Sequence, residues 1–318
     1  MNRRPGGTKP GFAHLRGLFR RLGPSMSRLR IRHETLYTYP RPVSFGPWRL
    51  LMRPLDTHAI RLVRASLEMQ AAASPRWTYD AYGNSICTFS PQGPSDRLRV
   101  VNHLLIERYP APLKLDNPQS ALPLVYDTAD RTVLEPYIAP ATADRDTAYL
   151  DWLRSRMGPA DEPALDFLQR FNSAIHQGFT YGAREEEGTQ GPAETVAWGQ
   201  GTCHDFAWLM IESLRRLGFA ARFATGYLYS ARTAASGVRG AGATHAWCEV
   251  FLPDLGWVEF DPTNGLAESH DLIRVATTRT PAEASIMNGE VLDDVEECTL
   301  KVALDVDLVA PDDFTAAA

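Results

Sequence analysis

Apolar and polar positions alternate along the first third of the chain, and this pattern predicts β-strands. Between residues 28 and 39 one face carries Leu29, Ile31, His33, Thr35 and Tyr37, and the other carries Arg28, Arg30, Arg32 and Glu34. Three further strand-like stretches follow, at 60–69, 77–90 and 98–109. Tyr82-Gly83-Asn84 predicts a tight hairpin within the second of them. We therefore expect residues 26–144 to form a β-rich, sandwich-like N-terminal domain that ends in a proline-rich, irregular connection over 110–144.

Helical spacing replaces the alternation from residue 146 onward. Residues 161–178 carry an apolar stripe that ends at a glycine, as helices commonly do. Residues 203–217 are apolar nearly all round, which predicts a central, buried helix. Three strands are expected after it, at 219–229, 244–252 and 256–260. Residues 145–270 should therefore form an α+β core in which the helix packs on an antiparallel sheet.

The C-terminal segment, residues 271–318, has one clear element. Leu300, Val302, Leu304, Val306 and Leu308 alternate with other residues over 299–309, which predicts an edge-type strand. Residues 271–298 are assigned no role.

Composition restricts the class of protein. The 318 residues are 44% hydrophobic and 22% charged, which is ordinary for a globular chain. No window contains about 18 consecutive apolar residues, so no membrane-spanning helix is expected. The four cysteines are too few for a disulfide scaffold, and because none form a CxxC pair, a structural zinc site is not expected either.

Charge is distributed unevenly around a net value of −5. The first 32 residues carry nine Lys or Arg and no Asp or Glu, so the rest of the chain is acidic, which argues against a nucleic-acid partner. We expect residues 1–25 to be a disordered basic extension; a helix on a membrane surface or a transit peptide is the alternative. Because no secretory signal is evident and cysteines are few, a cytoplasmic location is expected.

Cys203 is the first candidate for chemistry. It follows Gly199-Gln200-Gly201-Thr202 and begins the predicted buried helix. Unpaired N–H groups at a helix N-terminus stabilise a thiolate and could also hold an oxyanion. The alternative is a small buried residue with no reactivity. His204 is adjacent, but because successive helical residues point in different directions, we expect that it does not serve the thiol.

His245 and Asp261 are the candidate partners of the thiol. His245 begins a predicted strand, and Asp261 follows the next one. Adjacent antiparallel strands bring the start of one beside the end of the other, so the carboxylate could orient the imidazole. Either residue taken singly is better explained as a satisfied polar group at a strand edge.

Several blocks around these residues resemble the bacterial transglutaminase-like family. They are GTCHDFA (201–207), LGFAAR (217–222), TGY (225–227), THAWCEV (244–250) and GWVEFDPTNG (256–265). HETLYTY (33–39) is similar to the start of the β-rich region that precedes this core in many bacterial members. Two positions depart from the family pattern, because many relatives have Gln in place of His204 and a Val-like residue in place of Thr202.

The resemblance implies a papain-like α+β core and a Cys–His–Asp triad. Cys203 would be the nucleophile, His245 the general base and acid, and Asp261 the orienting carboxylate. It implies cysteine-dependent acyl transfer on a carboxamide or peptide bond of a protein or peptide substrate. No cofactor or metal is expected, and the sequence has no acidic cluster of the EF-hand type that would support activation by calcium. Water as acceptor would make a protease or amidase, which we favour; an amine would make a transglutaminase. The oligomeric state is left open.

Two rivals and three weaker candidates remain. The chain could be a non-catalytic binding module of this fold, or a metal hydrolase that uses His204, His245 and carboxylates, although it lacks the His spacing of zinc sites. Trp198 could shape a substrate cleft but is more often a packing residue. Asp205 suits the first turn of a helix without any catalytic role. The glycine-rich loop at 231–243 is either a lid or an ordinary loop.

Overall fold

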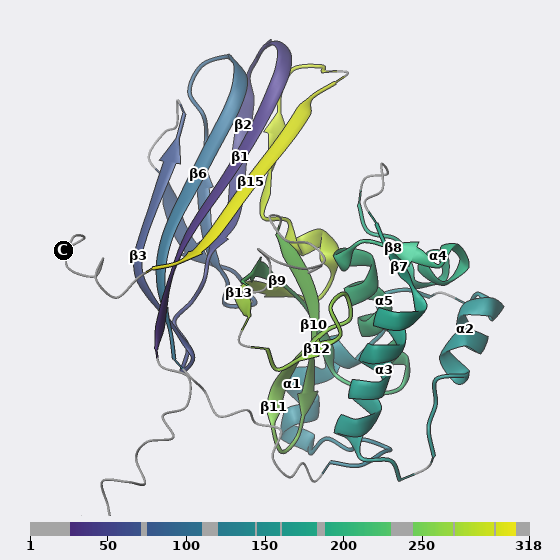
Figure 1. Ribbon diagram of the computed structural model, residues 1–318. Coiled ribbons are helices and arrows are strands. Elements are labelled where there is room, and N and C mark those ends of the chain that lie inside the picture. Colours follow the sequence, from purple (N-terminus) through teal and green to yellow (C-terminus); the bar gives the residue numbers. More distant parts are fainter. Residues whose placement is uncertain are drawn as a thin grey trace, which may run out of the picture.

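The computed structural model consists of a β-sandwich joined to a mixed α/β core (Figure 1). It describes residues 26–70, 75–109, 120–143, 145–159, 161–182, 188–229, 244–269, 271–295 and 297–309. The predicted α+β fold class is confirmed. The basic extension at 1–25 and the loop at 231–243 lie outside the described residues, so the interpretations of these segments stay predictions. Within the described ranges, no helix is long and apolar enough to cross a bilayer.

Two antiparallel sheets make the sandwich. The first has the order β15-β1-β6-β3, with bounds Thr299–Leu308, Ser27–Val43, Ser95–Arg108 and Ile60–Met69. The second has the order β14-β2-β5-β4, with bounds Met287–Val291, Phe45–Arg53, Ser85–Phe89 and Arg76–Tyr79. Trp48, Leu50, Cys87 and Val100 are buried between them. The predicted hairpin is confirmed, since β4 and β5 pair on either side of Gly83.

The C-terminal segment returns to this sandwich. β15 pairs with β1 from Leu29 opposite Leu308 to Thr38 opposite Thr299, and β14 pairs with β2. The edge strand predicted near the end of the chain is therefore confirmed. As a result, one outer edge of the first sheet is built from the last described part of the chain, which lies beside the core in Figure 1.

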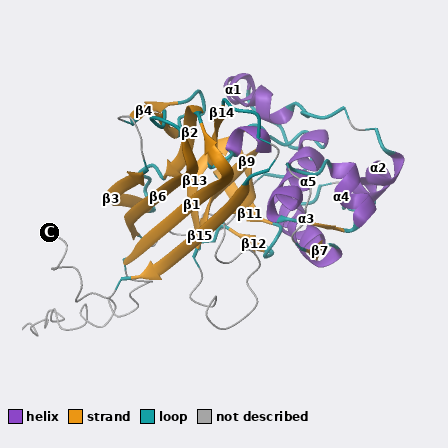
Figure 2. Cartoon of the chain, turned by 90° about the horizontal axis from the view of Figure 1, so that it is seen from above, coloured by secondary structure: helices purple, strands orange, loops and turns teal. Residues whose placement is uncertain are grey.

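The core contains a five-stranded antiparallel sheet of order β12-β11-β10-β9-β13. The strands span Leu266–Ala267, Gly256–Asp261, His245–Leu252, Ala221–Leu228 and Leu272–Thr278. Residues 271–298, to which the sequence assigned no role, thus supply β13 as well as β14 and the 3₁₀ helix η3 (Pro281–Ala284). In both overall views the sheet lies between the sandwich and the helices (Figure 2).

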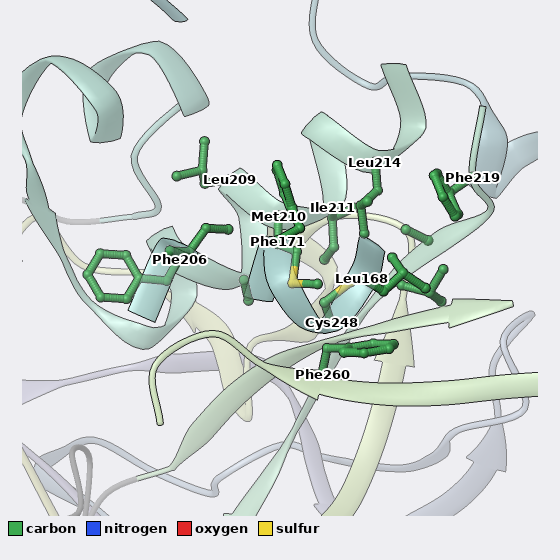
Figure 3. Packing of buried hydrophobic residues seen from close by; sticks show 14 of the residues in the cluster. Leu168, Phe171, Phe206, Leu209, Met210, Ile211, Leu214, Phe219, Cys248 and Phe260 are labelled. Atoms are coloured by element: carbon green, nitrogen blue, oxygen red, sulfur yellow. The ribbon is translucent and has the colours of Figure 1, made fainter. Parts of the chain in front are cut away.

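The predicted central helix is α5, Cys203–Arg216. Its apolar residues pack against α3 (Ala164–Gly178) and the sheet, and Figure 3 shows this cluster around Phe206, Met210, Phe171 and Phe260. Those four side chains are fully buried. Because α5 is surrounded by packed side chains, its N-terminus is held in a fixed position.

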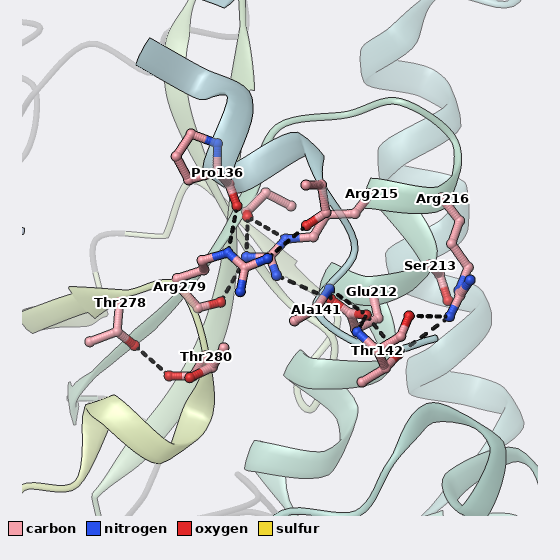
Figure 4. Close-up of polar contacts among 12 residues, drawn as sticks. Pro136, Ala141, Thr142, Glu212, Ser213, Arg215, Arg216, Thr278, Arg279 and Thr280 are labelled. Carbon is pink, nitrogen blue, oxygen red and sulfur yellow. Dashed lines mark hydrogen bonds and ion pairs between the residues drawn. The ribbon is translucent and has the colours of Figure 1, made fainter. Parts of the chain in front are cut away.

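Polar contacts anchor the other end of α5 (Figure 4). The carboxylate of Glu212 accepts hydrogen bonds from the backbone N–H groups of Ala141 and Thr142 and from the Arg215 guanidinium. Arg215 also donates to the carbonyl oxygens of Ala221 and Arg279. Both charged side chains have no exposed surface. The pair therefore joins the helix to the start of β9 and to the chain that follows β13.

Two helices were missed by the sequence analysis. α1 (Thr128–Ile138) lies within the stretch expected to be irregular, and α4 (Pro192–Trp198) lies within the polar stretch before Cys203. α1 buries only Leu134 and Ile138, and it contains Pro136, which favours an interruption. α4 has seven residues, too few for a helical period to stand out. The short α2 (Thr147–Arg154) begins after Asp146, where helical spacing was predicted to start.

The sandwich packs directly on the core sheet. Leu29, Ile31, Leu104 and Ile106 from β1 and β6 are buried together with Tyr227, Ile273 and Val275 from β9 and β13. His33 adds a polar contact, because its Nδ1 lies 3.2 Å from the hydroxyl oxygen of Tyr227. The face of β1 that the sequence predicted to be buried is therefore the face that meets the core.

Candidate active site

Cys203 begins α5, as the sequence predicted. Thr202 is the N-cap, and the carboxylate of Asp205 accepts hydrogen bonds from the Thr202 backbone N–H at 2.8 Å and from the Gln190 backbone N–H at 2.7 Å. Asp205 is fully buried and acts as a structural cap, in line with the non-catalytic interpretation. Gly201 is needed here, because a Cβ at that position would lie 2.9 Å from the Cβ of Asp205.

His245 and Asp261 meet across the β10–β11 hairpin. His245 Nε2 donates to Asp261 Oδ2 at 2.8 Å, which confirms the predicted pairing. Asp261 is held in turn by the Thr263 backbone N–H at 2.9 Å and by the Asn264 side-chain amide at 2.9 Å. Both members of the pair have no exposed side-chain surface. A fully buried carboxylate with these donors holds the imidazole in one orientation.

Asn264 is a residue of this site that the sequence analysis did not single out. Its amide binds the same carboxylate oxygen as His245 does. The available signal was its place in the Asp-Pro-Thr-Asn-Gly turn that follows β11, where an amide side chain can reach back to a carboxylate three residues earlier.

The thiol of Cys203 and the imidazole of His245 interact electrostatically. Burial would raise the pKa of the thiol, but the charges of His204 and His245 outweigh it and lower the pKa to about 5. Burial would lower the pKa of His245, but Asp261 and then Cys203 outweigh it and raise the pKa to about 10. Between these values the favoured state is a thiolate beside an imidazolium.

His245 Nδ1 is the nitrogen left over from the Asp261 contact. It is buried and makes no hydrogen bond of ordinary geometry within the described part of the chain. The His245 ring nevertheless acts on the thiol through both hydrogen bonding and charge, which lower the pKa of Cys203 and raise that of His245. A nitrogen in this position is available to exchange a proton with sulfur.

The expectation that His204 does not serve the thiol was wrong. Its Nδ1 lies 3.5 Å from Sγ of Cys203. Helical side chains lean toward the N-terminus of their helix, and the first turn has no preceding turn to separate them. The side chains of the first two residues of α5 therefore project past the helix end into the same space. Burial lowers the pKa of His204, but the Cys203 thiolate outweighs this and raises it.

Two regions of the chain match models of known protein families. Residues 152–262 match the family model of the transglutaminase-like superfamily, and residues 29–107 match that of the bacterial transglutaminase-like N-terminal region. The chain belongs to the transglutaminase-like superfamily. Its two regions correspond to the core and the sandwich described above.

Relatives of this transglutaminase-like chain extend over most of its length. An uncharacterized protein of Mycobacterium tuberculosis is 28% identical over 290 residues, which cover 88% of this chain and 92% of the relative. An uncharacterized protein of Mycobacterium leprae is 25% identical over 282 residues, covering 83% and 93%. A crystal structure from Cytophaga hutchinsonii, described as a candidate cysteine protease, has a TM-score of 0.70 at 15% identity and covers 90% and 92%. This last likeness shows a shared fold.

The remaining candidates are the other three cysteines and Trp198. Cys87 and Cys248 are fully buried in the two cores, as expected, and burial raises the pKa of each. Cys298 is exposed. Trp198 ends α4 with 53% of its surface exposed, so it is not a core residue.

A cavity of about 800 Å³ opens at the site, between the transglutaminase-like core and the sandwich. Thr202, His204 and Thr244 line its core side. The side formed by β1 and β15 is lined by His33, Thr35, Tyr37, Leu300 and Val302. We call this cavity the interdomain groove. Its size is in the range of a site for a small molecule or a short peptide.

Proposed function

We propose that this chain is a cysteine-dependent acyl-transfer enzyme that acts on a carboxamide or peptide bond, with water as the acyl acceptor. One observation carries the proposal. A thiol with a lowered pKa stands at a helix N-terminus and interacts with an imidazole whose other nitrogen is hydrogen-bonded to a buried carboxylate. Activated thiol nucleophiles are built in this way.

In the first half-reaction the Cys203 thiolate attacks the carbonyl carbon, and the carbonyl π electrons move to oxygen. Backbone N–H groups at the N-terminus of α5 can stabilise that oxyanion. The oxyanion then collapses, the C–N bond breaks, and the His245 imidazolium gives its proton to the departing nitrogen. The products are a free amine and a thioester on Cys203.

In the second half-reaction a water molecule attacks the thioester while neutral His245 takes a proton from it. Collapse of the second tetrahedral intermediate breaks the C–S bond and releases a carboxylic acid. The thiolate and the imidazolium are restored. An amine in place of water would give a new amide, so the same residues would support transglutamination; water is favoured because it is always present and no described residue marks an amine site.

Alkylation by iodoacetamide, mapped cysteine by cysteine, tests the nucleophile. At about pH 6 an ordinary thiol, with a pKa of about 8.5, reacts slowly. We expect Cys203 to be labelled faster than Cys298, which is the matched control because it is more exposed. We expect His245→Ala to slow labelling at Cys203 without affecting Cys298. Circular dichroism checks that the variant is folded.

Labelling of Cys203 no faster than that of Cys298 in the folded protein would overturn the proposal and favour a binding module. Where labelling is fast, the acceptor is decided by hydrolysis in H₂¹⁸O with a peptide library, alongside incorporation of a fluorescent primary amine. We expect ¹⁸O in the product carboxylates, no incorporated amine, and loss of the reaction in Cys203→Ala.

A further inference from the structure

Most side chains that line the interdomain groove are uncharged. Among the described residues that line it there is no Asp, Glu, Lys or Arg. Hydroxyl groups and apolar side chains predominate, as in Thr35, Thr244, Ile286 and Met287. Of its two imidazoles, His33 has a pKa that burial lowers to about 4, so it is neutral at pH 7. The pKa of His204 is raised, but its charge is balanced by the Cys203 thiolate, whose Sγ lies 3.5 Å from its Nδ1. Because bringing a charge into such a surface costs desolvation without a compensating partner, the groove favours an uncharged occupant.

The two faces of β15 differ in polarity. Lys301, Asp305 and Asp307 lie on one face. On the opposite face Leu304 and Val306 pack in the cluster shared with β9 and β13, and Leu300 and Val302 line the groove. On the groove side Leu300 is 51% exposed and Val302 is 43% exposed. An antiparallel sheet face that contacts only water usually carries polar residues. Leu300 and Val302 are instead apolar where they border the groove.

The groove is bordered by the chain neighbours of the reactive thiol and of its imidazole partner. Thr202 and His204 flank Cys203 in the chain, and Thr244 precedes His245. A substrate bound in the groove would lie between these residues and the wall formed by β1 and β15. The N-terminal sandwich thus supplies one side of the groove.

We propose that the interdomain groove binds an acyl donor with uncharged, apolar residues next to the reacting carbonyl, and that Leu300 and Val302 are specificity-determining residues. The proposal rests on the proposed function of Cys203 as a nucleophile. It identifies the substrate class as a peptide or acyl chain that is apolar near the bond to be cleaved. It also gives β15, from the far end of the sequence, a direct part in substrate selection.

Two thiol-directed reagents of equal length test this substrate class. Acetyl-Leu-Leu-Ala chloromethyl ketone is apolar, and acetyl-Glu-Glu-Ala chloromethyl ketone is acidic; both alkylate a thiol positioned by peptide binding. We expect the Leu reagent to label Cys203 at least about tenfold faster, since one well-placed apolar side chain is worth that factor or more. We expect Leu300→Glu to lower its rate by about tenfold. Acetyl-Lys-Lys-Ala chloromethyl ketone should label Cys203 faster in Leu300→Glu than in the original chain, because its positive charges attract the new carboxylate.

Leu308→Glu is the matched control. Leu308 lies on the same strand and the same face and is 58% exposed, but it does not line the groove. We expect it to leave every rate unchanged. Should Leu300→Glu not fold, Val302→Thr, which keeps the shape of the side chain, takes its place, with a drop of about threefold expected.

Iodoacetamide separates the two proposals, because it is too small to need the groove. Fast labelling of Cys203 by iodoacetamide, together with equal rates for the Leu and Glu reagents, would overturn the substrate class while the proposed function stands. Slow labelling by iodoacetamide would overturn the proposed function itself. Equal effects of Leu300→Glu and Leu308→Glu, or faster labelling in Leu300→Glu by both peptide reagents, would contradict the role of the groove wall.

Discussion

Sγ of Cys203 and Nδ1 of His204 lie 3.5 Å apart, although the two residues are consecutive in a helix. The contact places the thiol beside two imidazoles, those of His204 and His245. Both lower the pKa of Cys203 against the opposing effect of burial, and His204 contributes the larger charge effect. His204 therefore stabilises the Cys203 thiolate together with His245, the partner of Asp261.

The first prediction concerns His204→Gln, which introduces the residue that many relatives carry. Removing the imidazolium charge should raise the pKa of the Cys203 thiol from about 5. A rise of about one unit or more is expected from the loss of a charge in direct contact. The rate of iodoacetamide alkylation, measured from pH 4 to pH 9, should show its inflection at a correspondingly higher pH.

His204→Ala provides the comparison for this experiment. It removes the charge and also the side-chain bulk, so the same shift in both variants would assign the effect to charge. An inflection unchanged in His204→Gln would show that His245 alone sets the reactivity of the thiol.

The second prediction concerns Asp261→Asn. Loss of the carboxylate charge should lower the pKa of His245 from about 10, because Asp261 is the largest influence that raises it. The new amide group would also turn a donor toward Nε2 and favour the wrong imidazole tautomer. We expect hydrolysis of a peptide library to fall by about 1,000-fold or more, as in a serine triad, and the alkylation inflection to move to higher pH.

Asp254→Asn is the matched control for Asp261→Asn. Asp254 lies in the turn at the other end of the same β10–β11 hairpin, where it binds the backbone N–H of Ser120. The control should alter neither rate nor inflection. Near-normal hydrolysis in Asp261→Asn would mean that the carboxylate does not orient His245 during the reaction.

The sequence was enough to predict the placement of Cys203, His245 and Asp261, because each lies at the boundary of a strongly patterned element. The contact of His204 with the thiol was not predictable in this way, since it depends on how two side chains turn at a helix end. Leu300 and Val302 were recognised as strand residues, but their place beside the site depends on the pairing of β15 with β1, near the other end of the chain. Alternation within one strand carries no information about such a partner.

The third prediction concerns His33 and acid stability. Burial lowers its pKa in the folded protein to about 4, whereas an unfolded chain has the ordinary value of 6.5. Its contribution to stability is therefore complete above about pH 6.5 and is lost as the pH falls to about 4, by about 3 kcal/mol in all. Urea unfolding at pH 7 and pH 4 should show that His33→Asn loses less stability on acidification than the original chain.

Tyr227→Phe distinguishes burial from the hydrogen bond at His33. It removes the hydroxyl that lies 3.2 Å from Nδ1 but leaves the imidazole buried. We expect it to cost about 1 kcal/mol of unfolding free energy at both pH values. The dependence on pH should persist, and its loss in Tyr227→Phe would contradict burial as the cause.

The fourth prediction concerns the buried pair of Glu212 and Arg215. Neither side chain is exposed, and the carboxylate also satisfies the N–H groups of Ala141 and Thr142. Glu212→Gln leaves the guanidinium buried without its counter-charge, which typically costs about 3–5 kcal/mol. Urea unfolding measures this loss.

The helix pair Arg131 and Glu135, with nitrogen and oxygen 3.7 Å apart, is exposed by 61% and 59% and provides the matched control. Glu135→Gln should change the unfolding free energy by no more than about 0.5 kcal/mol. A cost at Glu212 as small as that at Glu135 would show that the buried arginine is stabilised by the carbonyl oxygens of Ala221 and Arg279 alone.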